Sequence, residues 1–124
     1  MKPPIAPLPS RLWLLQLSEV IGSRIRKRVE TWPKLDKDRL GDQIIRAIDS
    51  VGANITEGYV RIHVKERLNF YSIARGSLEE TLFHIGRARE RGLVNRLESF
   101  TLSDLLLKLS RALAALNERT MDDK

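Results

Sequence analysis

Apolar side chains recur every three to four residues over four stretches of the chain, which is the spacing of one buried face on an α-helix. The pattern predicts helices over residues 11–31, 37–57, 64–91 and from about residue 101 to residue 120. No strand pattern competes, and the short connections favour an all-α antiparallel four-helix bundle with up-down-up-down topology. The four predicted stripes consist of Leu14, Leu17, Ile21, Ile25 and Val29; Leu40, Ile44, Ile48, Val51 and Ile55; Tyr71, Ala74, Leu78, Leu82 and Ile85; and Leu102, Leu105, Leu109, Ala112 and Leu116.

Start and stop signals set the expected ends of these helices. Ser10 and Asp36 are suited to cap the first two helices at their amino ends. The sequence "TLSD" from Thr101 resembles a capping box with aspartate in place of glutamate, and it predicts the start of the fourth helix. Gly58 and Gly92 are suited to end the second and third helices.

The length of 124 residues indicates one domain. We expect the bundle to occupy residues 11–120. Residues 1–10 hold four prolines and predict an extended lead-in, and residues 121–124 form a polar tail.

The predicted helices carry more apolar surface than one buried stripe needs, because a monomeric bundle leaves about half of each helix polar. This surplus favours a homo-oligomer with a second buried surface, while a wide stripe in a monomer is the alternative. The surplus residues are Leu12, Trp13, Leu15 and Val20; Phe70, Ile73 and Phe83; and Leu106, Leu107 and Leu113.

Composition narrows the possible chemistry. Without cysteine, a disulfide framework, a thiolate metal site and a cysteine nucleophile are excluded. Glu80 and His84 stand four residues apart and not three, and no second such pair exists, so a di-iron bundle site is not expected. No phosphate-binding loop or nucleophile–base pattern is present. We therefore expect no catalytic residues, no cofactor and no enzyme activity, and His84 is expected on a helix surface or at an interface.

The sequence also bears on location. No apolar run approaches the length of a membrane span, and the amino terminus does not resemble a secretory signal. A cytoplasmic protein is the default expectation.

The stretch "GANITEG" at residues 52–58 can be a polar seam between the second and third helices or a ligand site. In an antiparallel hairpin centred near residue 62, Arg46 would approach Glu79 or Glu80. Asn54 would approach Tyr71 and Ser72, and Glu57 would approach Arg67 or Arg61. The seam is the favoured interpretation, because a partly buried polar pair can fix the register of packed helices.

Two ordered motifs resemble the 23S rRNA intervening-sequence proteins, a family of four-helix-bundle proteins. The first ends the predicted second helix with Ala53, Asn54, Ile55, Thr56, Glu57 and Gly58, where the family usually has alanine at the position of Thr56. The second follows an aromatic residue in the third helix and consists of Ile73, Ala74, Gly76, Ser77, Leu78 and an acidic residue. The "TWP" turn at residues 31–33 also matches, and the resemblance covers about residues 14–115.

This resemblance implies a four-helix bundle that assembles as a ring, typically a homopentamer. It implies a genomic setting in rRNA intervening sequences more than a defined activity. A distant branch is similar to retroelement accessory variability proteins, which bind nucleic acid and a reverse transcriptase. Within the motifs, Asn54, Glu57, Gly58, Gly76 and Ser77 are expected to have structural roles, with Gly76 serving close helix packing.

Basic residues supply the strongest functional signal in a chain of net charge +6. In an up-down bundle the carboxyl ends of the first and third helices lie together, so their cations would form one basic end able to bind phosphate backbones without sequence preference. RNA or DNA is therefore the expected partner, and docking of an acidic protein, such as a reverse transcriptase, is the alternative. The candidate nucleic-acid-binding residues are Arg24, Arg26, Lys27, Arg28, Arg87, Arg89, Arg91 and Arg96.

Overall fold

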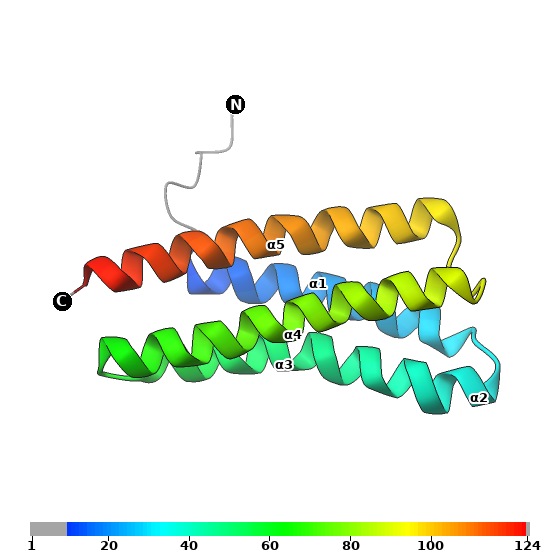
Figure 1. Cartoon of the computed structure of the whole chain (residues 1–124), viewed down its shortest axis with the longest axis horizontal. Helices are drawn as coiled ribbons and strands as arrows, with labels where there is room; N and C mark the ends of the chain where they lie inside the picture. Colours follow the sequence, from blue (N-terminus) through cyan, green and yellow to red (C-terminus); the bar gives the residue numbers. More distant parts are fainter. Residues whose placement is uncertain (1–9, 124) are drawn as a thin grey trace.

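The computed structural model describes residues 10–123, which form four long helices and no strand. The long helices are α1 (Arg11–Glu30), α3 (Asp42–Val60), α4 (Val64–Glu90) and α5 (Arg96–Asp122). They lie side by side along the long axis of the molecule (Figure 1). α3 packs against α1 and α4, and α5 packs against α4 and α1. The all-helical prediction is confirmed. The proposed lead-in at residues 1–10 lies outside the described part except for Ser10, and α5 continues into the predicted tail as far as Asp122.

The first helix begins and ends where the sequence predicts. Ser10 has extended backbone angles, and its hydroxyl accepts a hydrogen bond from the Trp13 amide at 3.0 Å. The helix ends at Glu30, and the Thr31 hydroxyl donates to the Arg28 carbonyl at 2.7 Å. Pro33 follows directly, and it cannot supply an amide to prolong α1.

The prediction that Asp36 caps the second helix is wrong. Helical backbone resumes directly after Pro33, through α2 (Lys34–Asp36) and the π-helical turn η1 (Lys37–Gly41), before α3 begins. Asp36 already has helical angles and its side chain makes no capping bond. The Pro33 carbonyl accepts from the Lys37 amide at 3.0 Å, so the first turn is set by the proline and Asp36 lies inside it.

The prediction that Gly58 ends this helix is also wrong. α3 continues through Gly58 to Val60, and Arg61 is the first residue with extended angles. A Cβ atom at Gly58 would lie 2.7 Å from Cε1 of Tyr71 and 3.0 Å from Cβ of Phe70. Glycine is therefore required here by the close approach of α4 and not by a helix stop.

Gly92 does end α4, as predicted. Its φ of +72° is left-handed, and the Leu93 amide donates to the Ala88 carbonyl at 2.9 Å. α5 then starts at Arg96 and not at Thr101, because the Asn95 side chain accepts from the Glu98 amide at 2.7 Å. Thr101 lies inside the helix, where its hydroxyl donates to the Leu97 carbonyl at 3.0 Å.

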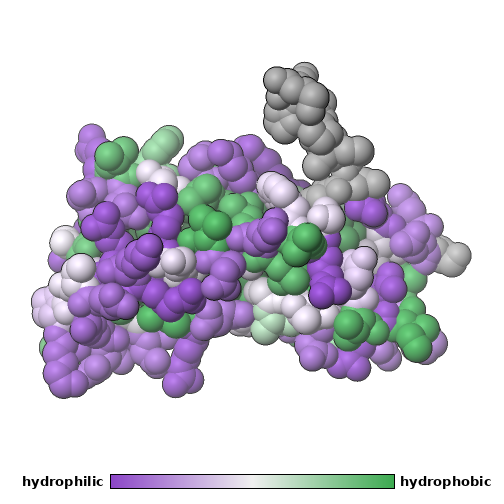
Figure 2. All heavy atoms as spheres, turned by 180° about the vertical axis from the view of Figure 1, so that it is seen from behind, coloured by the Kyte–Doolittle hydropathy of each residue, from purple (hydrophilic) through white to green (hydrophobic). Residues whose placement is uncertain are grey.

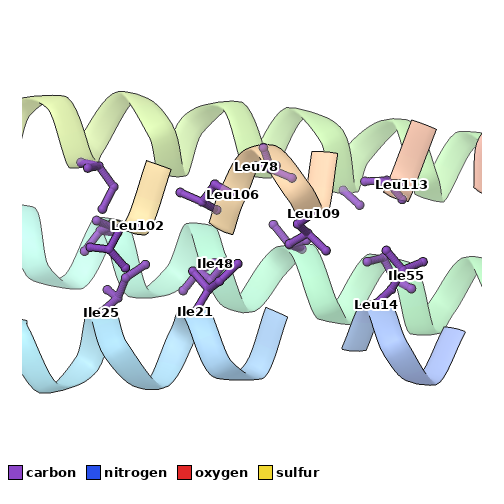
Figure 3. Close-up of a cluster of buried hydrophobic side chains, with 14 of the residues drawn as sticks. Leu14, Ile21, Ile25, Ile48, Ile55, Leu78, Leu102, Leu106, Leu109 and Leu113 are labelled. Carbon is purple, nitrogen blue, oxygen red and sulfur yellow. The ribbon is translucent and has the colours of Figure 1, made fainter. Parts of the chain in front are cut away.

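The core is one continuous cluster to which all four long helices contribute (Figure 3). Every residue of the four predicted stripes is buried, apart from Leu17, Leu82 and Leu105, which are partly buried against the core. Leu106 and Leu113, which were counted as surplus, are fully buried in this same core. Part of the apolar surplus is therefore used within the chain and does not require a second copy.

Candidate nucleic-acid interface

One end of the bundle is built from the last turns of α1 and α4, the α2–η1 segment and the start of α5. Trp32 holds these parts together: its ring is buried, and its indole nitrogen donates to the Leu93 carbonyl at 3.0 Å. Gly41 lies so close to α1 that a Cβ atom there would be 2.6 Å from Cγ1 of Val29. All eight candidate nucleic-acid-binding residues lie on the helix segments that lead into this end, which we call the basic end.

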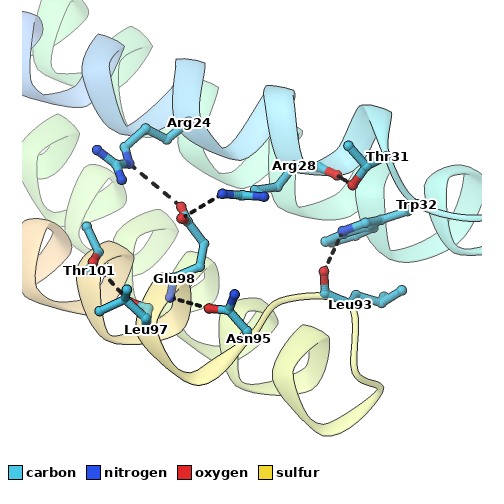
Figure 4. A network of polar contacts seen from close by, with 9 residues as sticks. All are labelled: Arg24, Arg28, Thr31, Trp32, Leu93, Asn95, Leu97, Glu98 and Thr101. Carbon is cyan, nitrogen blue, oxygen red and sulfur yellow. Dashed lines mark hydrogen bonds and ion pairs between the residues drawn. The ribbon is translucent and has the colours of Figure 1, made fainter.

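Glu98 is the acidic centre of the basic end (Figure 4). Its side chain is only 10% exposed, and its carboxylate lies 3.2 Å from Nη2 of Arg28 and 3.7 Å from Nε of Arg24. Both arginines are about half exposed. Their positive charge is already offset by the buried Glu98 carboxylate. Their first role is therefore to join α1 to α5.

A third candidate, Arg26, is also engaged within the chain. Its guanidinium lies 3.2 Å from Glu19 and 3.5 Å from Asp49, both exposed, and this places the side chain between α1 and α3. Such pairs contribute little to stability in water. They nevertheless offset the positive charge that Arg26 would present to a phosphate.

The remaining five candidates are exposed and form no ion pair within residues 10–123. Arg87 stands over the ring of Phe83, with its guanidinium carbon 5.5 Å from the ring centre. Seen from behind, the end of the molecule where α2 lies is mostly hydrophilic (Figure 2). Among the eight candidates, the unpaired positive charge therefore resides in Lys27, Arg87, Arg89, Arg91 and Arg96, and the exposed Lys37 and Arg39 of η1 add to it.

Sequence reasoning missed a cleft of about 470 Å³ at this end, between the α2–η1–α3 segment and α4. Arg39 from η1 lines it together with Arg87 of α4 and Arg91, the residue that follows α4. The rest of its lining is formed by Leu35, Asp36, Leu40, Gln43, Phe83 and His84. Arg39 is not among the candidate residues, because nothing in its sequence spacing indicates that it shares a cleft with the end of α4.

Of the two locations expected for His84, the helix surface is wrong, and the interface stays a prediction. The residue is 6% exposed, and neither ring nitrogen has a hydrogen-bond partner in the described structure. Glu80 Oε2 is 3.9 Å from Nε2, too far for a hydrogen bond. Burial lowers the pKa of His84, Glu80 opposes that shift, and Arg87 adds to it. A neutral buried imidazole without partners is costly unless a ligand or solvent serves it.

The motif residues form a polar seam between α3 and α4, although not with the predicted partners. Asn54 Nδ2 donates to the carbonyl of Ser50 at 2.8 Å and to its hydroxyl at 3.0 Å. The hydroxyls of Ser50 and Ser77 lie 2.8 Å apart and connect the two helices. The expected approach of Asn54 to Tyr71 and Ser72 is replaced by this chain of three side chains.

Arg46 pairs with Asp42 of its own helix at 2.9 Å, and the predicted contact with Glu79 or Glu80 is absent from the described ion pairs. Gly76 is exposed, and a Cβ atom added there would meet nothing within 4 Å. The prediction that Gly76 serves close helix packing is therefore wrong within this chain. Glycine at this position leaves room on the outer surface of α4.

The opposite end of the bundle uses its cations locally. Glu57 pairs with Arg61 at 2.7 Å, as one of the two expected partners, and Arg61 also stands over the ring of Phe70 at 4.9 Å. Arg67 donates to the Arg61 carbonyl at 2.7 Å, and Arg11 stands over Tyr59 at 4.9 Å. Arg11, Arg61 and Arg67 are thus engaged with neighbouring groups, and Lys65 is exposed without an ion pair in the described structure.

Within residues 10–123, no three histidine or carboxylate side chains gather in a way that could hold a metal ion. None of the described helices is long and apolar enough to cross a membrane.

Comparison with known proteins shows the family of this chain. No curated protein sequence matches the chain. The family model described as 23S rRNA-intervening sequence protein matches residues 11–115, which span the four helices up to the last turns of α5. This match agrees with the resemblance carried by the Ala53–Gly58 and Ile73–Leu78 motifs. The chain belongs to the 23S rRNA-intervening sequence protein family.

Proposed function

We propose that this protein binds RNA or other nucleic acid non-specifically through its basic end, without catalysing a reaction. The observation that carries the proposal is the group of five exposed cations without ion pairs, Lys27, Arg87, Arg89, Arg91 and Arg96, on three helices that meet at one end. A group of cations of this kind attracts phosphates whatever the base sequence. Among residues 10–123, the opposite end has no comparable group, since Arg11, Arg61 and Arg67 are engaged with their neighbours.

We further infer that consecutive helices alternate in direction and that the bundle assembles as a homo-oligomeric ring, with five copies as the preferred number. Contacts at the two ends support the alternation: Trp32 meets Leu93 at one end, and Arg11 meets Tyr59 at the other. Exposed apolar side chains support the assembly. They include Leu12, Trp13 and Val20 of α1, Ile73 and Phe83 of α4, and Leu97, Phe100 and Leu107 of α5. In a ring, symmetry would repeat the basic end around the axis.

The test compares two triple variants that remove the same charge. The first is Lys27→Gln, Arg89→Gln and Arg96→Gln at the basic end. The control is Lys65→Gln, Arg75→Gln and Arg111→Gln, which are exposed and lack ion pairs among the described residues. Affinity for a single-stranded RNA of arbitrary sequence is measured by fluorescence anisotropy over a range of salt concentrations.

We expect log Kd to rise linearly with log salt concentration for the unmodified protein. The basic-end variant should lower the slope by about 2, since each phosphate contact on a single strand contributes about 0.7. The control variant should leave the slope nearly unchanged. Equal losses in the two variants would indicate a net-charge effect and refute an end-specific interface. If the unmodified protein binds no RNA at low salt, the nucleic-acid proposal fails, and an acidic protein such as a reverse transcriptase becomes the partner to seek.

A further inference from the structure

The cleft between the α2–η1–α3 segment and α4 combines charge, shape and an unsatisfied buried group. Arg39, Arg87 and Arg91 line it, and Asp36 is the one acidic residue in the lining. The lining therefore has a net charge of two positive units. A phosphate monoester carries about −1.5 to −2 charges at pH 7, which matches this value.

We propose that this cleft binds the terminal phosphate monoester of a nucleic-acid strand. The proposal rests on the nucleic-acid binding proposed above and divides its cations: Lys27, Arg89 and Arg96, outside the cleft, hold the strand, and the cleft with Arg87 and Arg91 recognises its end. An internal phosphodiester has two free oxygens, and its chain must leave on both sides. A terminal monoester offers three free oxygens and only one chain, so it can enter between opposed walls.

The arginines come from opposite walls, which suits a phosphate held between them. Arg39 belongs to η1, whereas Arg87 lies in the last turn of α4 and Arg91 directly follows that helix as its C-cap residue. Guanidinium groups form paired, charge-assisted hydrogen bonds to phosphate oxygens. Gln43 adds an amide donor to the lining. Phe83 is 59% exposed at the cleft and already holds Arg87 over its ring, so a terminal base could stack beside it.

His84 is the observation that separates this cleft from an ordinary charged groove. Its ring forms part of the lining, it is more than nine-tenths buried, and both ring nitrogens lack partners in the described structure. Glu80 and Arg87 of α4 are the charged groups that act on it, and Arg91, Asp36 and Arg39 line the same cleft. Both ring nitrogens are buried. Donation from one of them to a phosphate oxygen requires the ring to turn toward the cleft, and it would remove the cost of leaving that nitrogen unpaired.

The experiment uses three probes with the full chain: a short RNA with a 5′-phosphate, the same RNA with a 5′-hydroxyl, and inorganic phosphate. Both RNAs carry a fluorophore at the 3′ end, and the readout is the ratio of their dissociation constants at moderate salt. We expect the phosphorylated strand to bind at least about tenfold more tightly, because two or more charge-assisted hydrogen bonds form only with it.

The cleft variant is Arg39→Gln with Arg91→Gln. Both side chains are exposed, so the substitutions remove no core packing. It should bring the ratio close to one. The control is Arg89→Gln with Arg96→Gln, which removes equal charge from the same end but outside the cleft lining. It should weaken both strands alike and leave the ratio unchanged. In nitrogen-detected NMR, the phosphorylated strand should shift the ring signals of His84 and leave those of exposed His63 in place.

Each other outcome has a definite meaning. A ratio of one in the unmodified protein overturns the strand-end site and leaves non-specific binding intact. Loss of the ratio in the control variant as well as the cleft variant would assign the preference to general charge and not to the cleft. If inorganic phosphate shifts His84 but neither strand does, the cleft is a free-phosphate site and the strand-end proposal is wrong. If neither strand binds, the proposed nucleic-acid binding is refuted, and the strand-end site that rests on it is refuted with it.

Discussion

Gly58 and Gly86 are both inside helices, yet replacing each with alanine should change stability in opposite directions. In a solvent-facing helix interior, alanine is better than glycine by about 1 kcal/mol. Gly86 has nothing within 4 Å of an added Cβ atom, so Gly86→Ala should stabilise the protein by roughly 0.5–1 kcal/mol. Gly58→Ala gains the same helix propensity, but its added Cβ atom would be too close to side chains of α4.

The size of that obstacle follows from the contacts of Gly58. An added Cβ would lie 2.7 Å from Cε1 of Tyr71, whose side chain is 1% exposed and cannot move aside. It would also lie 3.0 Å from Cβ of Phe70, which is fixed to the α4 backbone. Overpacking of this kind costs about 1–3 kcal/mol. With the propensity gain subtracted, Gly58→Ala should destabilise the protein by about 1–2 kcal/mol.

Thermal unfolding followed by circular dichroism, at one fixed protein concentration, measures both effects. A domain of this size shifts by about 4 °C per kcal/mol, so the two variants should differ in Tm by roughly 6–12 °C. If Gly58→Ala proved as stable as Gly86→Ala, the close contact between α3 and α4 would be wrong, and Gly58 would be a simple helix-interior glycine.

Three further predictions concern assembly, charge and pH. Light scattering at micromolar concentration should give a mass several times the 14.2 kDa of one chain, and a clean monomer would contradict the ring. Glu57→Ala should lower the free energy of unfolding by about 0–1 kcal/mol, because its pair with Arg61 is half exposed. Glu98→Ala should lower it by about 1–3 kcal/mol, because a buried, hydrogen-bonded carboxylate is lost. Similar losses for the two variants in urea unfolding would contradict the difference in burial. The pKa of His84 is lowered below 6.5 in the folded protein, so the unfolded chain takes up a proton at this residue first as the pH falls. The free energy of unfolding should therefore decrease from pH 7 downward until the folded-state pKa is passed. His84→Gln should remove that part of the pH dependence.

The helical periodicity of the sequence determined the class of the fold and its core. The stripe that runs from Leu40 in η1 to Ile55 in α3 is buried throughout, because apolar residues at the helical period all lie on one face of the helix. Local signals that act within one turn were also readable: Ser10 caps α1 and Gly92 ends α4 through bonds to neighbours three to five residues away.

The sequence misled where a distant contact overrides a local preference. Gly58 has the form of a helix stop, but Tyr71 from α4 occupies the space that any side chain would need. A competing local signal also misled: Asn95, and not Thr101, caps α5 through its bond to the Glu98 amide. The burial of His84 could not be predicted from its neighbours along α4, because it depends on the packing of α3 against α4.

For the candidate interface, too, the sequence determined some features and the tertiary structure decided others. Its location at one end followed from the sequence, since the order of the helices and the run of arginines at their carboxyl ends require no knowledge of side-chain contacts. The distinction between paired and unpaired cations required the tertiary structure, because Glu98 reaches Arg28 across 70 positions of the chain. The cleft lined by Arg39, Arg87 and Arg91 likewise depends on how the α2–η1–α3 segment lies relative to the end of α4. Periodicity encodes which face of each helix is buried, whereas pairings between distant side chains depend on the distances and rotations that packing sets between the helices.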